Sequence, residues 1–182
     1  MNDIIMETER LIIRRFKAED WQDLYDYLSK EEVVRYEPYG IYTEEESKKE
    51  AARRADDEAF FAVELKENHK VIGNIYFAKE GPEQFLTWEI GYVFNSDYQG
   101  KGYATEASRR ILKYGFEELN AHRIMARCNP LNKKSWHLME RLKMRREGHF
   151  INNAFHSTEE NGRPIWHDAY EYAILSKEFK CN

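Results

Sequence analysis

Three strand-like segments joined by short connections restrict how the middle of this chain can fold. Alternating or continuous apolar residues mark strands at 60–65, 71–77 and 85–94, and the turn-forming residues between them predict an antiparallel meander. The last strand leads into a segment with helical spacing at 103–119, and 123–128 then alternates as a strand. A helix that joins two strands returns the chain parallel to the first strand, so these segments predict a strand–helix–strand crossover. The sheet should therefore be mixed.

Helical signals flank the meander. Apolar residues recur at helical spacing over 21–28, and Thr43 stands three residues before Glu46, which is typical of an N-terminal capping box. Asn132 can cap a further helix that runs to about Leu142. The remaining expected strands lie at 9–16 and on the two sides of a connection at 159–164, the first of that pair after Gly148.

These segments predict an α+β fold of the α/β three-layer type, with helices flanking a mixed, mostly antiparallel central sheet. A chain of 182 residues with 42% hydrophobic content can bury one ordinary core. It contains no internal repeat, low-complexity tract or Pro/Gly/Ser-rich linker, so we expect a single domain over residues 1–182. Nothing in the sequence decides between a monomer and a homodimer.

The distribution of charge excludes several classes of partner. The formal net charge is −5, and acidic and basic residues are mixed along the chain without the basic stripe that nucleic acid requires. No run of 18 apolar residues occurs, so no membrane partner is expected. Two cysteines, Cys128 and Cys181, are too few for a disulfide framework and favour a reducing, cytoplasmic setting. The histidines are scattered, and His156 and His167 lie in no metal-ligand pattern, so no metal is expected.

The loop at 95–102 joins a predicted strand directly to a predicted helix, with Gly100 and Gly102 beside the helix start. Unpaired N–H groups and the positive end of the helix dipole make such a place a ready site for an anion. The glycines also fit a plain strand-to-helix turn. A P-loop would require a Lys-Ser or Lys-Thr after its second glycine, and a dinucleotide fingerprint would require a third glycine; both are absent.

The segment Gln99-Gly100-Lys101-Gly102-Tyr103-Ala104 resembles, position by position, the phosphate-binding signature Gln/Arg-x-x-Gly-x-Gly/Ala of the GNAT superfamily of N-acetyltransferases. The string GKGYATEA that starts at Gly100 is similar to the branch that contains the ribosomal-protein N-terminal (alanine/serine) acetyltransferases. The resemblance implies the acyl-CoA N-acyltransferase fold and acetyl-coenzyme A as cosubstrate. The backbone of Tyr92, Val93 and Phe94 would pair with the pantetheine arm, and the loop residues Gln99, Gly100, Lys101, Gly102, Tyr103, Ala104 and Thr105 would hold the pyrophosphate.

A second motif follows the strand at 123–128. Asn132 and Ser135 resemble an Asn-x-x-Ser of the same branch, in which Asn132 would bind the pantetheine and Ser135 would give a proton to the leaving thiolate. Leu138, Met139 and Leu142 stand three, four and seven residues after Ser135, which places the hydroxyl on the inward-facing stripe of the helix. An asparagine cap followed by a serine is also an ordinary helix start.

Glu89 is the candidate general base. A free amine is largely protonated at neutral pH, so a carboxylate that removes its proton promotes attack on a thioester. Alternation places Glu89 opposite Trp88 and Ile90, as a lone carboxylate in an apolar strand. Burial there would raise its pKa, although an exposed charge or a structural partner for an arginine fits the same position. The resemblance also implies that a backbone N–H near Val93 meets the negative charge on the reacting oxygen.

The function that these residues predict is transfer of the acetyl group of acetyl-CoA to a primary amine by direct attack, with a peptide N-terminus as one acceptor. Alternatives are a small-amine acetyltransferase acting on polyamines or aminoglycosides, and a noncatalytic coenzyme A-binding sensor or interaction module. Aromatic and acidic residues near the first helices and the last two strands could meet the acceptor. They are Tyr36, Glu37, Tyr39, Tyr42, Phe150, Phe155, Glu159, Glu160, Trp166 and Asp168.

Overall fold

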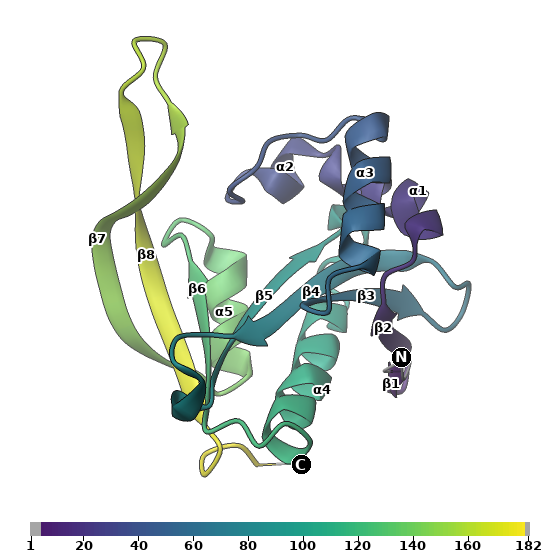
Figure 1. Ribbon diagram of the computed structural model, residues 1–182, viewed down its shortest axis with the longest axis vertical. Helices are drawn as coiled ribbons and strands as arrows, with labels where there is room; N and C mark the ends of the chain where they lie inside the picture. The colour runs from purple at the N-terminus through teal and green to yellow at the C-terminus, as the bar shows by residue number, and fades with distance from the viewer. Residues whose placement is uncertain (1–4, 181–182) are drawn as a thin grey trace.

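A computed structural model describes residues 5–180, so Cys181 lies outside the described residues. One mixed sheet runs through the molecule in the order β1-β2-β3-β4-β5-β6-β8-β7 (Figure 1). Its strands are β1 (Ile5–Glu7), β2 (Leu11–Arg15), β3 (Phe60–Leu65), β4 (Val71–Lys79), β5 (Thr87–Phe94), β6 (Arg123–Cys128), β7 (Arg145–Thr158) and β8 (Pro164–Leu175). The α-helices are α1 (Trp21–Leu28), α2 (Glu31–Val34), α3 (Glu44–Ala55), α4 (Tyr103–Glu117) and α5 (Lys133–Arg141).

The predicted connections of the sheet are confirmed. Neighbouring strands from β1 to β5 pair antiparallel, which includes the expected meander of β3, β4 and β5. Strand β6 returns parallel to β5 after α4, as the crossover requires. Strand β8 then pairs antiparallel with both β6 and β7. The sheet is therefore mixed and mostly antiparallel, with a single parallel pair near its centre.

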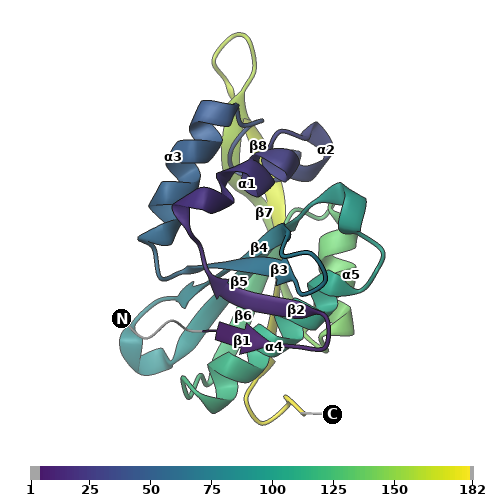
Figure 2. The same cartoon turned by 90° about the vertical axis from the view of Figure 1, so that its right-hand side faces the viewer.

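Helices cover both faces of the sheet and divide the core into two clusters (Figure 2). Helices α4 and α5 pack one face, where Ile111 and Leu138 are buried among strand residues such as Phe77. Helices α1 and α3 pack the other face through Leu24 and Ala51. Alternation along β5 sends side chains into both clusters and so fixes the strand between the two helical layers. Within residues 5–180 no helix is long and apolar enough to cross a membrane.

The capping predictions hold in detail. The Thr43 hydroxyl accepts the N–H of Glu46 at 3.3 Å, and the Glu46 carboxylate accepts the N–H of Thr43 at 2.8 Å. This reciprocal pair satisfies two backbone donors at the start of α3. The Asn132 side chain likewise accepts the N–H of Ser135 at 3.3 Å at the start of α5. Both helices therefore begin where their capping residues predict.

The structure differs from the prediction in four elements. Strand β1 and helix α2 were not expected, because three or four residues are too few to show a periodic pattern. Strand β5 begins at Thr87, since 83–85 form a 3-10 turn that ends in a left-handed residue, Leu86. Strand β7 begins at Arg145, so Gly148 lies inside it, at a shift of register that bends the strand.

The parallel pair of β5 and β6 is short, and the two strands then separate. Register pairs join only Thr87–Glu89 with Arg123–Met125, whereas β6 stays paired with β8 along its whole length. Among residues 5–180, the second half of β5 therefore has β4 on one side and no strand on the other. An opening inside a sheet leaves backbone N–H and C=O groups to be satisfied by something else. This opening is the place around which the candidate site is built.

Gly73 on β4 is needed where that strand meets the second half of β5. A Cβ atom added to Gly73 would lie 2.6 Å from the backbone oxygen of Val93, which cannot rotate away. We expect Gly73→Ala to reduce the free energy of unfolding by about 1–3 kcal/mol, the usual cost of overpacking. Urea denaturation measures the change. Gly91→Ala is the matched control on β5, because its Cβ would meet Tyr76 at an ordinary 3.6 Å; equal losses in the two variants would contradict this account.

Candidate active site

A single large cleft runs along the opening between β5 and β6. Its volume of about 2120 Å³ exceeds the range of roughly 300–1,000 Å³ that is usual for one small ligand, so it has room for two substrates. Its floor is the second half of β5, and one end reaches the loop before α4 and the start of α5. The remainder of the cleft is lined by residues 35–41 after α2 and by the inner side of the β7–β8 hairpin. We call these the loop end and the hairpin end of the cleft. Helix α2 itself contacts the loop, because the Ser96 hydroxyl donates to the Glu32 carboxylate at 3.0 Å.

The free edge of β5 presents backbone groups to the cleft. Thr87 and Asn95 both form backbone hydrogen bonds with β4-side partners, Glu80 and Ile72, and the register between them is regular. In an antiparallel pair, alternate residues direct their N–H and C=O groups to the partner strand. Val93 therefore directs its amide to β4, and Tyr92 and Phe94 direct theirs to the open side. The donor expected near Val93 would therefore be the amide of one of its two neighbours, which face the cleft.

The loop that follows β5 ends in a run of free amides. Gly100 and Gly102 have φ angles of 77° and 85°, which residues with a side chain rarely adopt. The first backbone hydrogen bond of α4 runs from the N–H of Glu106 to the carbonyl of Gly102 at 3.0 Å. The amides of the first turn before it have no helical acceptor, and they line the loop end of the cleft. These amides belong to Tyr103, Ala104 and Thr105.

Basic side chains surround this loop end. Arg109 and Lys133 line the cleft, together with Lys134 and Arg141. The ammonium group of Lys134 donates to the side-chain oxygen of Gln99 at 2.7 Å, which joins α5 to the loop. A helix N-terminus ringed by cations favours an anionic ligand. These four residues were not among the predicted site residues, although Arg109 lies one turn after Thr105, where a helix places it on the same face.

The side chains of the predicted loop residues have several separate roles. Gln99 caps the backbone carbonyl of Phe94 at 3.2 Å, so it fixes the loop. The Lys101 ammonium lies 5.2 Å from the centre of the Tyr98 ring, and its backbone carbonyl accepts a hydrogen bond from Arg10. The Thr105 hydroxyl accepts from Arg141 at 3.4 Å. The backbone is thus the part of this loop that is left to bind a ligand.

The structure brings Ser135 together with Tyr92 and Cys128 beside the free edge of β5. The Tyr92 hydroxyl lies 3.1 Å from the Ser135 hydroxyl and donates to the Ser135 carbonyl at 3.0 Å. Burial raises the pKa of Tyr92, and it raises the pKa of the nearby Cys128 thiol to about 11. Both groups therefore keep their protons at neutral pH. For Tyr92 the sequence had predicted a role of the backbone alone, and not one of the phenol side chain.

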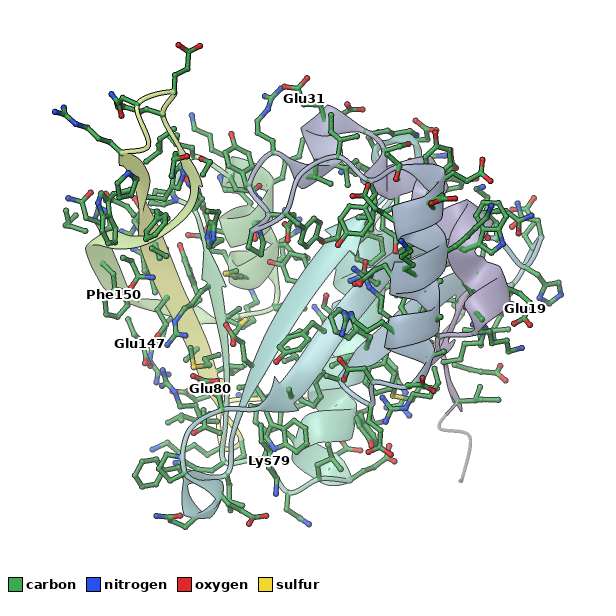
Figure 3. All side chains as sticks on the ribbon, turned by 45° about the horizontal axis from the view of Figure 1, so that its top comes forward. Glu19, Glu31, Lys79, Glu80, Glu147 and Phe150 are labelled. Atoms are coloured by element: carbon green, nitrogen blue, oxygen red, sulfur yellow. The ribbon has the colours of Figure 1, made fainter. Side chains whose placement is uncertain are left out.

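Glu89 lines the cleft as a partly buried carboxylate. Burial raises its pKa, as do the nearby charges of Glu80 and Glu171, while the positive charge of Arg127 opposes the shift. Figure 3 labels Glu80, which directly follows the last residue of β4. The Glu89 carboxyl thus combines a raised pKa with access to the cleft, as a general base requires.

A second carboxylate, Glu37, lies in the segment after α2. Its N–H donates to the Val34 carbonyl at 2.9 Å, and its side chain lines the hairpin end of the cleft. Burial raises the pKa of Glu37 to about 7, against the opposing effects of Arg54 and a hydrogen bond from Tyr39. The sequence shows no strand or helix at Glu37, so no periodicity could reveal its burial.

The aromatic residues expected to meet an acceptor divide between the cleft and the outer surface. Tyr36 and Tyr39 line the cleft, whereas Phe150, Phe155 and Trp166 are exposed and do not. Figure 3 shows Phe150 on the hairpin, far from α2 and its Glu31. The hairpin residues that do line the cleft are polar or small: Asn153, Ala154, His156, Ser157, His167, Asp168 and Ala169. Within residues 5–180 no three His, Cys, Asp or Glu side chains gather as metal ligands.

The chain is similar to known proteins over most of its length. The family model described as "Acetyltransferase (GNAT) domain" matches residues 10–145, which include β5, the loop, α4 and α5. The uncharacterized N-acetyltransferase YnaD of Bacillus subtilis is 44% identical over 173 residues, covering 94% of this chain and 97% of that protein.

Solved structures share the whole fold. A GNAT-family acetyltransferase from Bacillus anthracis superposes with a TM-score of 0.87 at 40% identity. The superposition covers 96% of this chain and 100% of that one. The ribosomal-protein-S5-alanine acetyltransferase of Vibrio fischeri superposes with a TM-score of 0.78 at 25% identity, covering 98% of this chain and 100% of that one. The expected acyl-CoA N-acyltransferase fold is thereby confirmed.

Gly102 tests whether the loop binds an anion through its backbone. In Gly102→Val the φ angle of 85° is strained and the added Cβ would lie 3.4 Å from Nη2 of Arg10. The loop backbone would have to shift, so we expect the affinity for coenzyme A to fall by about tenfold or more, equivalent to ~1.4 kcal/mol. Isothermal titration measures it. Gly162→Val carries the same backbone strain, at φ 81°, in the hairpin turn and serves as control. Unchanged affinity in the Gly102 variant would contradict the proposed cradle.

Proposed function

The chain belongs to the GNAT acetyltransferase family, and we propose that it moves the acetyl group of acetyl-CoA to a primary amine bound at the hairpin end of its cleft. The observation that carries this proposal is the continuity of the free backbone. The open edge of β5 leads directly into the loop and then into the unpaired amides of α4, all along one cleft. An extended ligand with an amide-bearing arm and a diphosphate matches that order of donors.

The residues present fit this ligand. The backbone of Tyr92 and Phe94 would pair with the pantetheine arm, and the side chain of Asn132 would meet it from α5. The amides from Gly100 to Thr105 would hold the pyrophosphate, with Lys133 and Arg109 as counter-charges. When bound, acetyl-CoA supplies the acetyl group as a thioester, which an amine can attack directly. No metal ion is needed for this chemistry.

Proton transfer is assigned to side chains around the middle of the cleft. Glu89 would take the proton from the attacking amine, and the amide of Tyr92 or Phe94 would donate to the oxygen that becomes negative. The Ser135 hydroxyl, which lies 3.1 Å from the Tyr92 hydroxyl, would give its proton to the departing sulfur and recover one from water. Glu37 would attract the cationic form of the amine from the opposite wall.

The acceptor that we favour is the N-terminus of a peptide. The hairpin end lies between two segments far apart in sequence, residues 35–41 and the inner face of the hairpin, and an extended chain can lie between them. The similarity to the Vibrio fischeri ribosomal-protein acetyltransferase supports the same acceptor. One observation favours small polycationic amines as second candidates, namely the acidic residues Glu31, Glu32 and Glu37 along one wall.

A panel of amines tests the proposal. Thiol release from acetyl-CoA would be followed with N-terminal peptides, polyamines and aminoglycosides, and binding of coenzyme A would be measured in parallel. We expect selective turnover with one class, and with peptides before the others. Binding without turnover on any amine would favour the noncatalytic sensor. Absence of both binding and turnover would contradict the proposal as a whole.

The two carboxylates make different predictions for catalysis. Glu89→Gln should lower kcat by about 10²-fold or more, the contribution usual for a general base, and leave the affinity for coenzyme A unchanged. The assay is steady-state turnover with the best amine of the panel. Glu89→Asp is the matched control, because it shortens the side chain and keeps the carboxylate. A kcat equal to that of the unsubstituted protein in Glu89→Gln would remove this residue from the mechanism.

Glu37 should act on amine binding in a pH-dependent manner. Its pKa of about 7 means that the side chain is neutral below that pH and charged above it. We therefore expect the KM for the amine to rise as pH falls through about 7, and Glu37→Gln to abolish this dependence while kcat changes less than in Glu89→Gln. KM and kcat measured from pH 5.5 to 8.5 provide the test. A large loss of kcat confined to Glu37→Gln would reverse the two assignments.

A further inference from the structure

Arg10, in the connection between β1 and β2, reaches across to the loop and to α4. Its Nη1 donates to the backbone carbonyl of Lys101 at 3.0 Å. Its Nε and Nη2 donate to one carboxylate oxygen of Glu106, at 2.8 and 2.6 Å. The guanidinium also lies 4.4 Å from the centre of the Tyr103 ring. One side chain thus contacts the loop, the first residue of α4 and the first turn of that helix.

The other oxygen of Glu106 is held by the same connection. It accepts the backbone N–H of Arg10 at 3.0 Å and the Thr8 hydroxyl at 2.6 Å. The carboxylate therefore has four hydrogen bonds from two neighbouring residues, and the pKa of Glu106 lies below its usual value despite partial burial, which opposes the shift. Glu106 is fixed as an anion in one orientation.

The contact with Lys101 sets the direction of the next amide. In a trans peptide the C=O and the following N–H point in opposite directions across one plane. Because the Lys101 carbonyl is directed toward Arg10, the N–H of Gly102 is directed away from Arg10. Gly102 lines the cleft, whereas Arg10 does not. The guanidinium therefore binds the carbonyl edge of this peptide group, and the opposite edge, which carries the Gly102 N–H, is left for a ligand in the cleft.

The contact with Glu106 removes an electrostatic penalty. Glu106 lies in the first turn of α4 and also lines the cleft, where an anionic ligand would meet the free amides. A carboxylate without a partner at this place would repel a diphosphate, since like charges a few ångströms apart interact strongly where water is partly excluded. Arg10 offsets that charge without taking up any of the amides that would bind the ligand.

We propose that Arg10 is a positioning residue for the pyrophosphate of the acyl donor: it directs the Gly102 amide into the cleft and neutralises Glu106 beside the bound diphosphate. The inference rests on the proposed function, since it assumes that the donor is acetyl-CoA. It differs from a purely structural role in one respect. A structural tie between β1–β2 and α4 would affect every substrate, whereas this role affects only ligands that carry the diphosphate.

Truncation of the donor separates these two roles. Acetyl-pantetheine keeps the thioester and the arm that would lie along β5 and lacks the diphosphate. We expect Arg10→Ala to lower kcat/KM for acetyl-CoA by about tenfold or more, as expected for loss of charge-assisted hydrogen bonds, and to leave kcat/KM for acetyl-pantetheine within about twofold. Equal losses for the two donors, or no loss for acetyl-CoA, would overturn the proposal.

Further variants protect the test from loss of folding. Arg10→Lys keeps the charge but loses the planar guanidinium that reaches both partners. Its kcat/KM for acetyl-CoA should therefore lie between the values of the unsubstituted protein and Arg10→Ala. Arg53→Ala is the matched control: it removes an arginine that is 50% exposed and paired with Glu50 and Asp57 on α3, against 42% for Arg10. Arg53→Ala should leave kcat/KM unchanged for both acetyl-CoA and acetyl-pantetheine. Thermal unfolding of each variant measures the loss of stability.

Titration with coenzyme A keeps the two proposals distinguishable. If the unsubstituted protein does not bind coenzyme A, the proposed function fails, whatever Arg10 does. If it binds and Arg10→Ala binds equally well, only the role of Arg10 fails. In the double variant Arg10→Ala/Glu106→Gln we expect part of the lost affinity to return, because the uncompensated carboxylate is removed. A double variant that binds more weakly than Arg10→Ala would contradict the electrostatic half of the inference.

Discussion

The separation of β5 from β6 is the constraint on which the rest of the site depends. A parallel pair that ends after Glu89 leaves hydrogen-bonding groups of Tyr92 and Phe94 inside the sheet without a strand partner. Buried backbone groups of this kind are costly unless something pairs with them. The chain keeps the gap open because β6 remains fully paired with β8 on its other side. The sheet thus carries an internal edge that a ligand, rather than a strand, can complete.

The loop that continues from this edge is held from both ends. Asn95, which is fully buried, donates to Asp26 of α1 at 3.0 Å and accepts from Lys30 at 2.8 Å. At the other end, Arg10 of the β1–β2 connection donates to the Lys101 carbonyl. Helix α1, Lys30 and the β1–β2 connection therefore fix a segment whose own backbone stays free. Such preorganisation lowers the conformational cost of binding.

Local patterns predicted most of the fold and the part of the site that follows from them. Alternation placed Glu89 opposite Trp88, the glycines marked the loop, and helical spacing placed Ser135 on the inner face of α5. Contacts between distant segments could not be read in this way. The pair Arg10–Glu106 joins residues 96 positions apart, and the direction of the Val93 amide depends on which residues of β4 it faces. Glu37 lies in a segment without regular structure, so its burial followed only from the three-dimensional arrangement.

The β7–β8 hairpin lies almost wholly outside the segment shared with the family, residues 10–145, yet its inner face forms one wall of the cleft. It joins the rest of the sheet through the pairing of β8 with β6, away from the loop and from α4. Substitutions at the hairpin tip would therefore alter the surface of one wall of the cleft while leaving the pairing of β6 with β8, and so the open edge of β5, in place.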